Sequence, residues 1–141
     1  MRAAAQRLTR RLGRRGALLT LKGVMATGYG SGQVFEPTGD RNGLTLLLKL
    51  RPLEWWGWAW ITAGALALVC AWLPPRRDWP GFLAVWLIAT PWAMAYFLSW
   101  WPLGESPRGW VVAMIFGAFG AVCLVAIGWE EPERAELPRG N

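Results

Sequence analysis

The chain has 141 residues, of which 54% are hydrophobic and only 17% charged, and the charged residues gather in short runs separated by long uncharged stretches. This distribution is typical of a membrane protein. The net charge of +6 indicates a membrane surface rather than nucleic acid, because six of the fifteen basic residues fall in the first fifteen positions.

Residues 1–15, MRAAAQRLTRRLGRR, form a basic N-terminal segment. Apolar residues such as Leu8 and Leu12 recur at helical spacing, which predicts an amphipathic helix lying on an anionic leaflet. A disordered basic tail that only sets the topology is the alternative. The residues expected to contact lipid or to set the topology are Arg7, Arg10, Arg11, Arg14 and Arg15.

Residues 16–35 are uncharged apart from Lys22 and contain five glycines. We predict a first transmembrane helix here, with an interfacial or re-entrant hairpin and a cleaved secretory signal as alternatives. A lysine at the centre of a span costs about 2.5 to 3.5 kcal/mol. Lys22 lies close to the basic end, so we expect its side chain to snorkel to the membrane surface at a lower cost.

The next segment connects this helix to the main apolar part of the chain. Residues 36–43, EPTGDRNG, combine the residue types that favour turns and predict a loop. Residues 44–50, LTLLLKL, are apolar but too short to span a membrane, so we expect a short helix lying at the interface.

Three further transmembrane helices are predicted at residues 53–73, 80–101 and 109–129, because about 20 apolar residues are needed to cross the hydrocarbon. Their connections are short and rich in proline, so consecutive helices should be antiparallel neighbours. Pro91 lies halfway along the middle helix, where we expect a kink. The fold class is therefore all-α, a helical bundle with one membrane-embedded domain over residues 16–129 and a solvated tail over 130–141.

Tryptophans lie near both ends of these predicted helices, as in the aromatic belts of membrane proteins. The stretch RPLEWWGWAW alone places four tryptophans within six positions. Those expected to anchor the helices at the membrane interfaces are Trp55, Trp56, Trp58, Trp60, Trp72, Trp79, Trp100, Trp101, Trp110 and Trp129. Trp86 and Trp92 lie deep in the middle helix, where an aromatic belt does not explain them.

Small residues recur every fourth position in two of the helices, a spacing that lets helices approach closely. Packing within the chain and self-association in the bilayer both remain open. The residues concerned are Ala63, Ala67 and Ala71 in one helix, and Ala113, Gly117 and Ala121 in the other.

The distribution of basic residues places the N-terminus in the cytoplasm. With four spans, ten basic residues lie on the N-terminal side and four on the other; with three spans, the split is eleven to four. The two topologies differ in the side of the C-terminal tail, which is cytoplasmic with four spans and external with three.

Residues that could carry chemistry are scarce. Histidine is absent, and no serine or cysteine is combined with a base in a pattern that indicates a nucleophile. Cys70 and Cys123 lie within apolar stretches at similar predicted depths, and we expect two buried reduced thiols rather than a metal site. We therefore predict a protein that is not an enzyme and binds no cofactor or metal.

The order of features resembles that of small multi-span membrane proteins encoded by actinobacterial (Streptomyces-type) phages. The shared features are the arginine-rich start, a glycine-bearing apolar segment, a Gly-Asp-Arg loop, and tryptophan-rich spans joined by LPPRRDWPGF and SPRGW. They cover residues 14–129, and the 13 arginines against 2 lysines fit a host of high GC content. The resemblance implies a phage protein in the cytoplasmic membrane of a bacterial host.

Three functional hypotheses follow. The first is a non-enzymatic accessory protein that acts through helix packing and contacts with other membrane proteins or with copies of itself. The second is a holin-like lysis protein that assembles into membrane lesions. The third, a small-molecule transporter or channel subunit, is weakened because only Lys22 provides an ionisable side chain within a predicted span.

Overall fold

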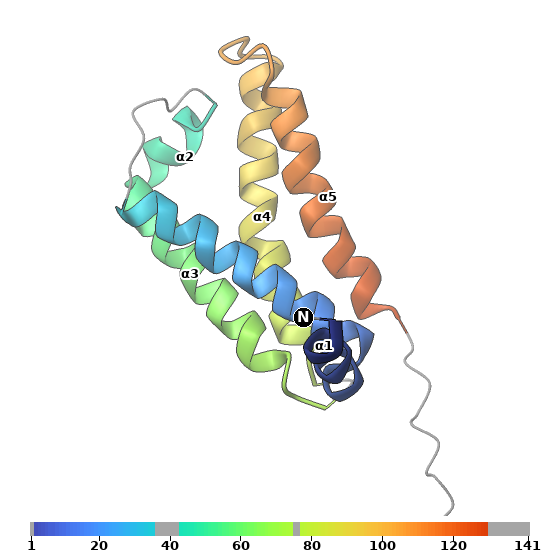
Figure 1. The fold of residues 1–141 in the computed structure, drawn as a ribbon. Helices are drawn as coiled ribbons and strands as arrows, with labels where there is room; N and C mark the ends of the chain where they lie inside the picture. The colour runs from blue at the N-terminus through green and yellow to red at the C-terminus, as the bar shows by residue number, and fades with distance from the viewer. Residues whose placement is uncertain (1, 36–42, 75–76, 130–141) are drawn as a thin grey trace, which may run out of the picture.

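Five helices make up the part of the chain that the computed structural model describes, namely residues 2–35, 43–74 and 77–129, with side chains from residue 13 onward. They are α1 (Arg2–Phe35), α2 (Thr45–Leu50), α3 (Leu53–Cys70), α4 (Trp79–Trp100) and α5 (Gly109–Ile127) (Figure 1). The described residues contain no strand, which confirms the predicted all-α class.

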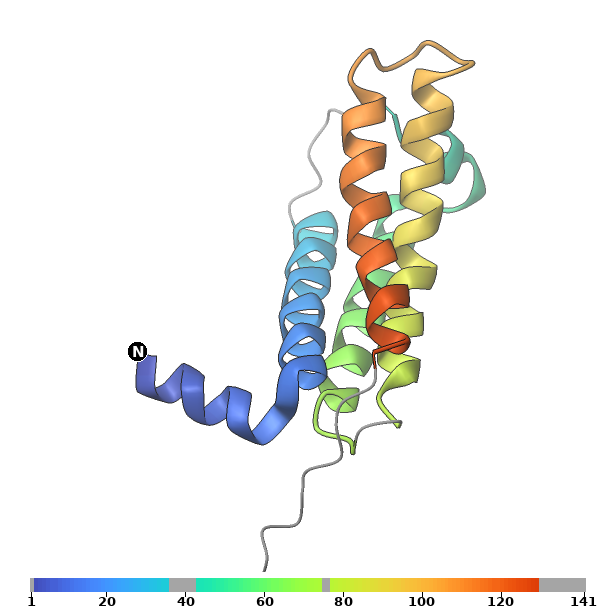
Figure 2. The ribbon, with the colours of Figure 1, turned by 90° about the vertical axis from the view of Figure 1, so that its right-hand side faces the viewer.

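The four long helices form an antiparallel bundle in which successive helices run in opposite directions (Figures 1 and 2). Helix α1 packs on α3, α3 on α4, and α4 on α5, while α1 also contacts α4. The short helix α2 packs against α4 at the end of the bundle where α3 begins. We call this end the tryptophan-rich end, and the opposite end, where α1 enters and α5 leaves, the basic end.

Helix α1 bends sharply at Gly13. The backbone of this residue has φ 70° and ψ −179°, a conformation that is essentially restricted to glycine. Figure 2 shows that the helical segment before Gly13 leaves the bundle at a steep angle at its basic end. The helix predicted within residues 1–15 is therefore present, whereas the side chains of Arg7, Arg10 and Arg11 lie outside the described part.

Glycines allow α1 and α3 to pack with their backbones in close contact. A Cβ atom added to Gly30 would lie 2.6 Å from the carbonyl oxygen of Gly57, and one added to Gly23 would lie 2.9 Å from that of Gly64. The glycines of each helix are seven residues apart, so both pairs lie on one seam. Close backbone approach of this kind is typical of helix packing in membranes.

Two buried clusters form the core. The cluster nearer the tryptophan-rich end includes Trp60 of α3 and Trp92 of α4. The cluster nearer the basic end includes Leu19, Phe82 and Cys123, which come from α1, α4 and α5. The clusters together join all four long helices into one bundle.

Of the helices that the structure describes, α4 and α5 are long and apolar enough to cross a membrane. In the most apolar part of each helix, only 33% of α4 and 22% of α5 is buried within the bundle, whereas the core helix of a soluble protein is mostly buried. The prediction of three clear spans is wrong, because α3 is not apolar enough to count as one; it also ends at Cys70 instead of residue 73. It has 18 residues, and Glu54 and the tryptophans of its first half lower its mean hydropathy. Helix α1 is long enough to cross a membrane but is not apolar enough.

Candidate functional site

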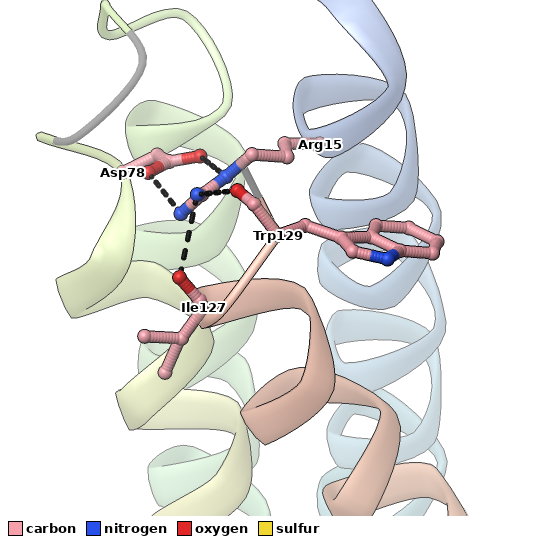
Figure 3. Close-up of polar contacts among 4 residues, drawn as sticks. All are labelled: Arg15, Asp78, Ile127 and Trp129. Carbon is pink, nitrogen blue, oxygen red and sulfur yellow. Dashed lines mark hydrogen bonds and ion pairs between the residues drawn. The ribbon is translucent and has the colours of Figure 1, made fainter. Parts of the chain in front are cut away.

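The most elaborate polar arrangement in the structure surrounds Arg15, at the basic end of the bundle (Figure 3). Its Nε and Nη2 atoms donate hydrogen bonds of 2.9 Å and 2.8 Å to the two carboxylate oxygens of Asp78. Its Nη1 atom donates to the carbonyl oxygens of Trp129 at 2.8 Å and Ile127 at 3.4 Å. A single side chain thus joins α1 to the start of α4 and to the C-terminal end of α5.

Both charges of this ion pair are withdrawn from solvent. Arg15 is 7% exposed and Asp78 is 3% exposed, and the guanidinium also lies 5.7 Å from the centre of the Phe82 ring. The planar guanidinium suits this position because its N–H groups match a carboxylate in a bidentate manner and leave donors for carbonyl oxygens. The carbonyl groups at the end of α5 have no amide partners within the helix, so Arg15 satisfies acceptors that would otherwise need water.

The prediction that Arg15 contacts lipid is therefore wrong. The helical bend at Gly13 separates Arg15 from the preceding segment and leaves it on the first turn that packs into the bundle. Its neighbour Arg14 is exposed, and its contact with lipid stays a prediction. Sequence reasoning also missed Asp78, whose only signal was an acidic residue at the end of the basic loop PPRRD, immediately before an apolar helix.

Lys22 is a second buried cation, and the prediction that it snorkels to the surface is wrong. Its side chain is 7% exposed, and its Nζ atom donates a 2.8 Å hydrogen bond to the carbonyl oxygen of Phe119 in α5. The same atom lies 3.6 Å from the centre of the Phe119 ring, within the range of a cation–π interaction. The lysine points into the bundle because α5 offers a carbonyl acceptor and an aromatic face at that level.

The two cysteines lie in the packed core of the bundle. Cys70 and Cys123 are buried free thiols of the same core cluster. Within the described residues, no group of three or more histidine, cysteine, aspartate and glutamate side chains could hold a metal ion. The Cys123 thiol lies 3.6 Å from the carbonyl oxygen of Phe119, the acceptor that Lys22 also uses.

An aromatic cluster occupies the bundle interior beside these residues. Tyr29 contacts Trp60 and Trp92 edge to face, with ring centroids 5.1 Å and 5.3 Å apart, and Phe116 of α5 packs against all three. Trp60 is 1% exposed, so the prediction that it anchors α3 at the membrane surface is wrong. One face of α3 carries Gly57 and Gly64 and is buried against α1. Of the four tryptophans in the RPLEWWGWAW stretch, only Trp60 lies on that face.

The cluster also accounts for Trp92, which is fully buried within it. Pro91 precedes it in a helix that continues unbroken from Trp79 to Trp100. Thr90, the residue before the proline, donates a 2.8 Å hydrogen bond from its hydroxyl group to the carbonyl oxygen of Trp86.

The other tryptophans predicted as anchors lie near the two ends of the bundle. Trp56 is half-buried, and its Nε1 atom donates a 3.1 Å hydrogen bond to the carbonyl oxygen of Leu47 in α2. The rest are exposed: Trp55, Trp58, Trp72, Trp79, Trp100, Trp101, Trp110 and Trp129.

The small residues predicted at helix contacts fall into two groups. Ala63, Ala67 and Ala71 are buried, as is Ala113 in α5. Gly117 and Ala121 are exposed on the outer surface of α5. The small residues of α5 that pack inward are instead Gly109, Ala113, Gly120 and Ala126.

Comparison of the chain with protein families, with curated proteins and with solved structures finds no match.

Proposed function

We propose that the chain is a non-enzymatic integral membrane protein of a bacterial cytoplasmic membrane, built as a four-helix bundle that acts through contacts with other membrane proteins. The observation that carries this proposal is the distribution of charge over the bundle. The described charged residues that are exposed all lie at its two ends: Arg14, Lys49, Arg51, Glu54, Arg77, Glu105 and Arg108. Between these ends, α4 and α5 expose large apolar side chains such as Leu87, Met94, Ile115 and Val125.

The hydrogen bonds of Arg15 support four membrane crossings rather than three. They hold the first packed turn of α1 beside the last turn of α5, at the basic end of the bundle. In the proposed topology both chain ends are cytoplasmic, because ten of the fifteen basic residues then lie on that side. Helices α1 and α3 cross as part of the bundle. The only charged residue of α1 after Arg15 is Lys22, and its side chain is packed against α5.

The N-terminal segment would then lie on the cytoplasmic leaflet. The bend at Gly13 turns it away from the bundle axis (Figure 2), and its arginines suit a surface that carries anionic lipids. Lipid contact by Arg7, Arg10 and Arg11 is part of this proposal, whereas Arg15 lies buried in the bundle.

Topology reporters test the membrane proposal directly. A reporter active only in the cytoplasm should work after Asn141 and fail when inserted between residues 36 and 43. A reporter active only outside should behave in the opposite way. Release of the protein from membranes by alkaline carbonate, or an external C-terminus, would contradict the proposed bundle.

The accessory role is tested by controlled expression in a bacterial host. An accessory protein should leave the membrane potential intact, as reported by a potential-sensitive dye. Abrupt depolarisation after a delay would instead indicate the holin-like alternative, and a slow solute-dependent leak would indicate a transporter or channel subunit. The origin in a phage rests on the sequence resemblance.

A further inference from the structure

The outer surface of the bundle has an apolar groove between α3 and α4. Its volume is about 650 Å³, and it is open to the outside. The α3 side is formed by one face of the helix, which includes Trp55, Trp58, Thr62 and Leu66. The hydroxyl group of Thr62 donates to the carbonyl oxygen of Trp58, so the hydrogen-bonding need of this polar residue is met within α3.

The length of the groove is close to the thickness of one leaflet of a bilayer. Trp55 and Leu66 are 11 residues apart, or about 16 Å along the helix axis. That is about half of the roughly 30 Å of hydrocarbon in a bilayer. The groove therefore begins near the tryptophan-rich end of α3 and extends past the middle of the bundle, because Leu66 and Ala84 lie in the halves of α3 and α4 nearer the basic end. An acyl chain from the leaflet at the tryptophan-rich end would fill its upper part.

A cation lies at the mouth of the groove. The guanidinium carbon of Arg51 lies 5.5 Å from the centre of the Trp55 ring, and the Arg51 side chain is exposed. Among the described residues, no carboxylate forms an ion pair with it. Its N–H donors are thus available for a phosphate group, which guanidinium binds in a bidentate manner.

We propose that this groove binds one acyl chain of an anionic phospholipid from the leaflet at the tryptophan-rich end, with its phosphate on Arg51. This inference rests on the membrane location proposed above. A phospholipid fits both parts of the site, because its apolar chain needs the groove and its phosphate needs a cation at the mouth. Glu54 lies next to the site and opposes the charge of the lipid, so it weakens binding without abolishing it.

Native mass spectrometry of the protein released from nanodiscs tests the proposal. The nanodiscs contain equal amounts of phosphatidylglycerol and phosphatidylcholine. We expect the wild-type protein to retain one phosphatidylglycerol. Arg51→Gln should weaken its retention about tenfold, which corresponds to about 1.4 kcal/mol. Glu54→Gln should strengthen it.

A groove-filling variant provides the second measurement. Ala59 lines the groove, so Ala59→Leu should displace the acyl chain and reduce the retention of both lipids. Two matched controls should behave like the wild type: Ala118→Leu on the exposed face of α5, and Arg108→Gln at the same end of the bundle.

Two results would overturn the proposal. One is equal lipid retention by Arg51→Gln, Ala59→Leu and the controls. The other is a dimer that Ala59→Leu dissociates, because the groove would then hold a second copy of the chain. Failure of the membrane location would be seen separately, as a protein that alkaline carbonate extracts and that does not enter nanodiscs.

Discussion

Arg15 and Asp78 form a bidentate ion pair across 63 residues of sequence, and both side chains are buried. Breaking such a pair on one side leaves an uncompensated charge in a medium that solvates it poorly. We predict that Asp78→Ala lowers the free energy of unfolding in detergent micelles by about 3 to 5 kcal/mol. Denaturation by sodium dodecyl sulfate, followed by tryptophan fluorescence, measures this quantity.

Glu105→Ala is the matched control, because Glu105 is an exposed carboxylate at the opposite end. It should change the free energy of unfolding by less than about 0.5 kcal/mol. The exchanged variant, Arg15→Asp with Asp78→Arg, should remain less stable than the wild type, because it aims a carboxylate at the carbonyl oxygens of Ile127 and Trp129. Full recovery by the exchange would show that those carbonyl contacts are unimportant.

The seam between α1 and α3 predicts opposite effects for glycines in the same helix. Gly30→Ala should destabilise the bundle by about 1 to 3 kcal/mol, because its Cβ would lie 2.6 Å from a backbone oxygen. Gly28→Ala and Gly32→Ala meet nothing within 4 Å. They should be neutral or stabilising by about 0.5 to 1 kcal/mol, since alanine favours a helix over glycine.

The same micelle assay compares the three glycine variants. Its discriminating result is their order of stability, with Gly30→Ala below the wild type and the other two at or above it. Equal effects at all three positions would mean that helix propensity, and not close packing, governs this helix.

The two lysines of the chain should differ in chemical reactivity. Lys49 is exposed, whereas the Nζ atom of Lys22 is enclosed between the Phe119 carbonyl group and ring. An amine-acylating reagent that partitions into membranes should therefore modify Lys49 and leave Lys22 unmodified until the protein is denatured. Peptide mass spectrometry gives the extent of acylation at each lysine. Equal acylation of Lys22 and Lys49 in the folded state would show that the Lys22 side chain reaches the surface.

The bend at Gly13 predicts that its replacement moves the N-terminal segment. Alanine at φ 70° and ψ −179° costs about 1 to 3 kcal/mol, so Gly13→Ala should favour a straight continuation of α1 into water. An environment-sensitive fluorophore at Ala5→Cys should then shift to longer emission wavelength. Gly32→Ala is the control, and unchanged emission in Gly13→Ala would argue against a segment held on the surface.

Much of the fold was predictable because it depends on local pattern. Uncharged stretches and proline-rich connections located the long helices, and the aromatic pattern placed most of the tryptophans at the two ends. The end of α3 was predicted three residues too late, because the sequence gives no strong stop signal between Cys70 and Pro74.

The interior was much less predictable, because it depends on which helix face meets which neighbour. The orientations of Arg15, Lys22 and Trp60 are fixed by partners 114, 97 and 32 residues away, at Trp129, Phe119 and Trp92. Single-helix periodicity carries no information about such partners. For the same reason it could not separate the buried Ala113 from the exposed Gly117 and Ala121 in one repeating pattern.

The long sequence separation within the Arg15 cluster also sets an order of events during synthesis. Arg15 leaves the ribosome 63 residues before Asp78 and 114 before Trp129. At about 5 to 20 residues per second, the carboxylate follows after roughly 3 to 13 seconds. During that interval the carboxylate that pairs with Arg15 in the folded bundle has not yet been made. Closure of the bundle is therefore completed only after the last residues of α5 have been made.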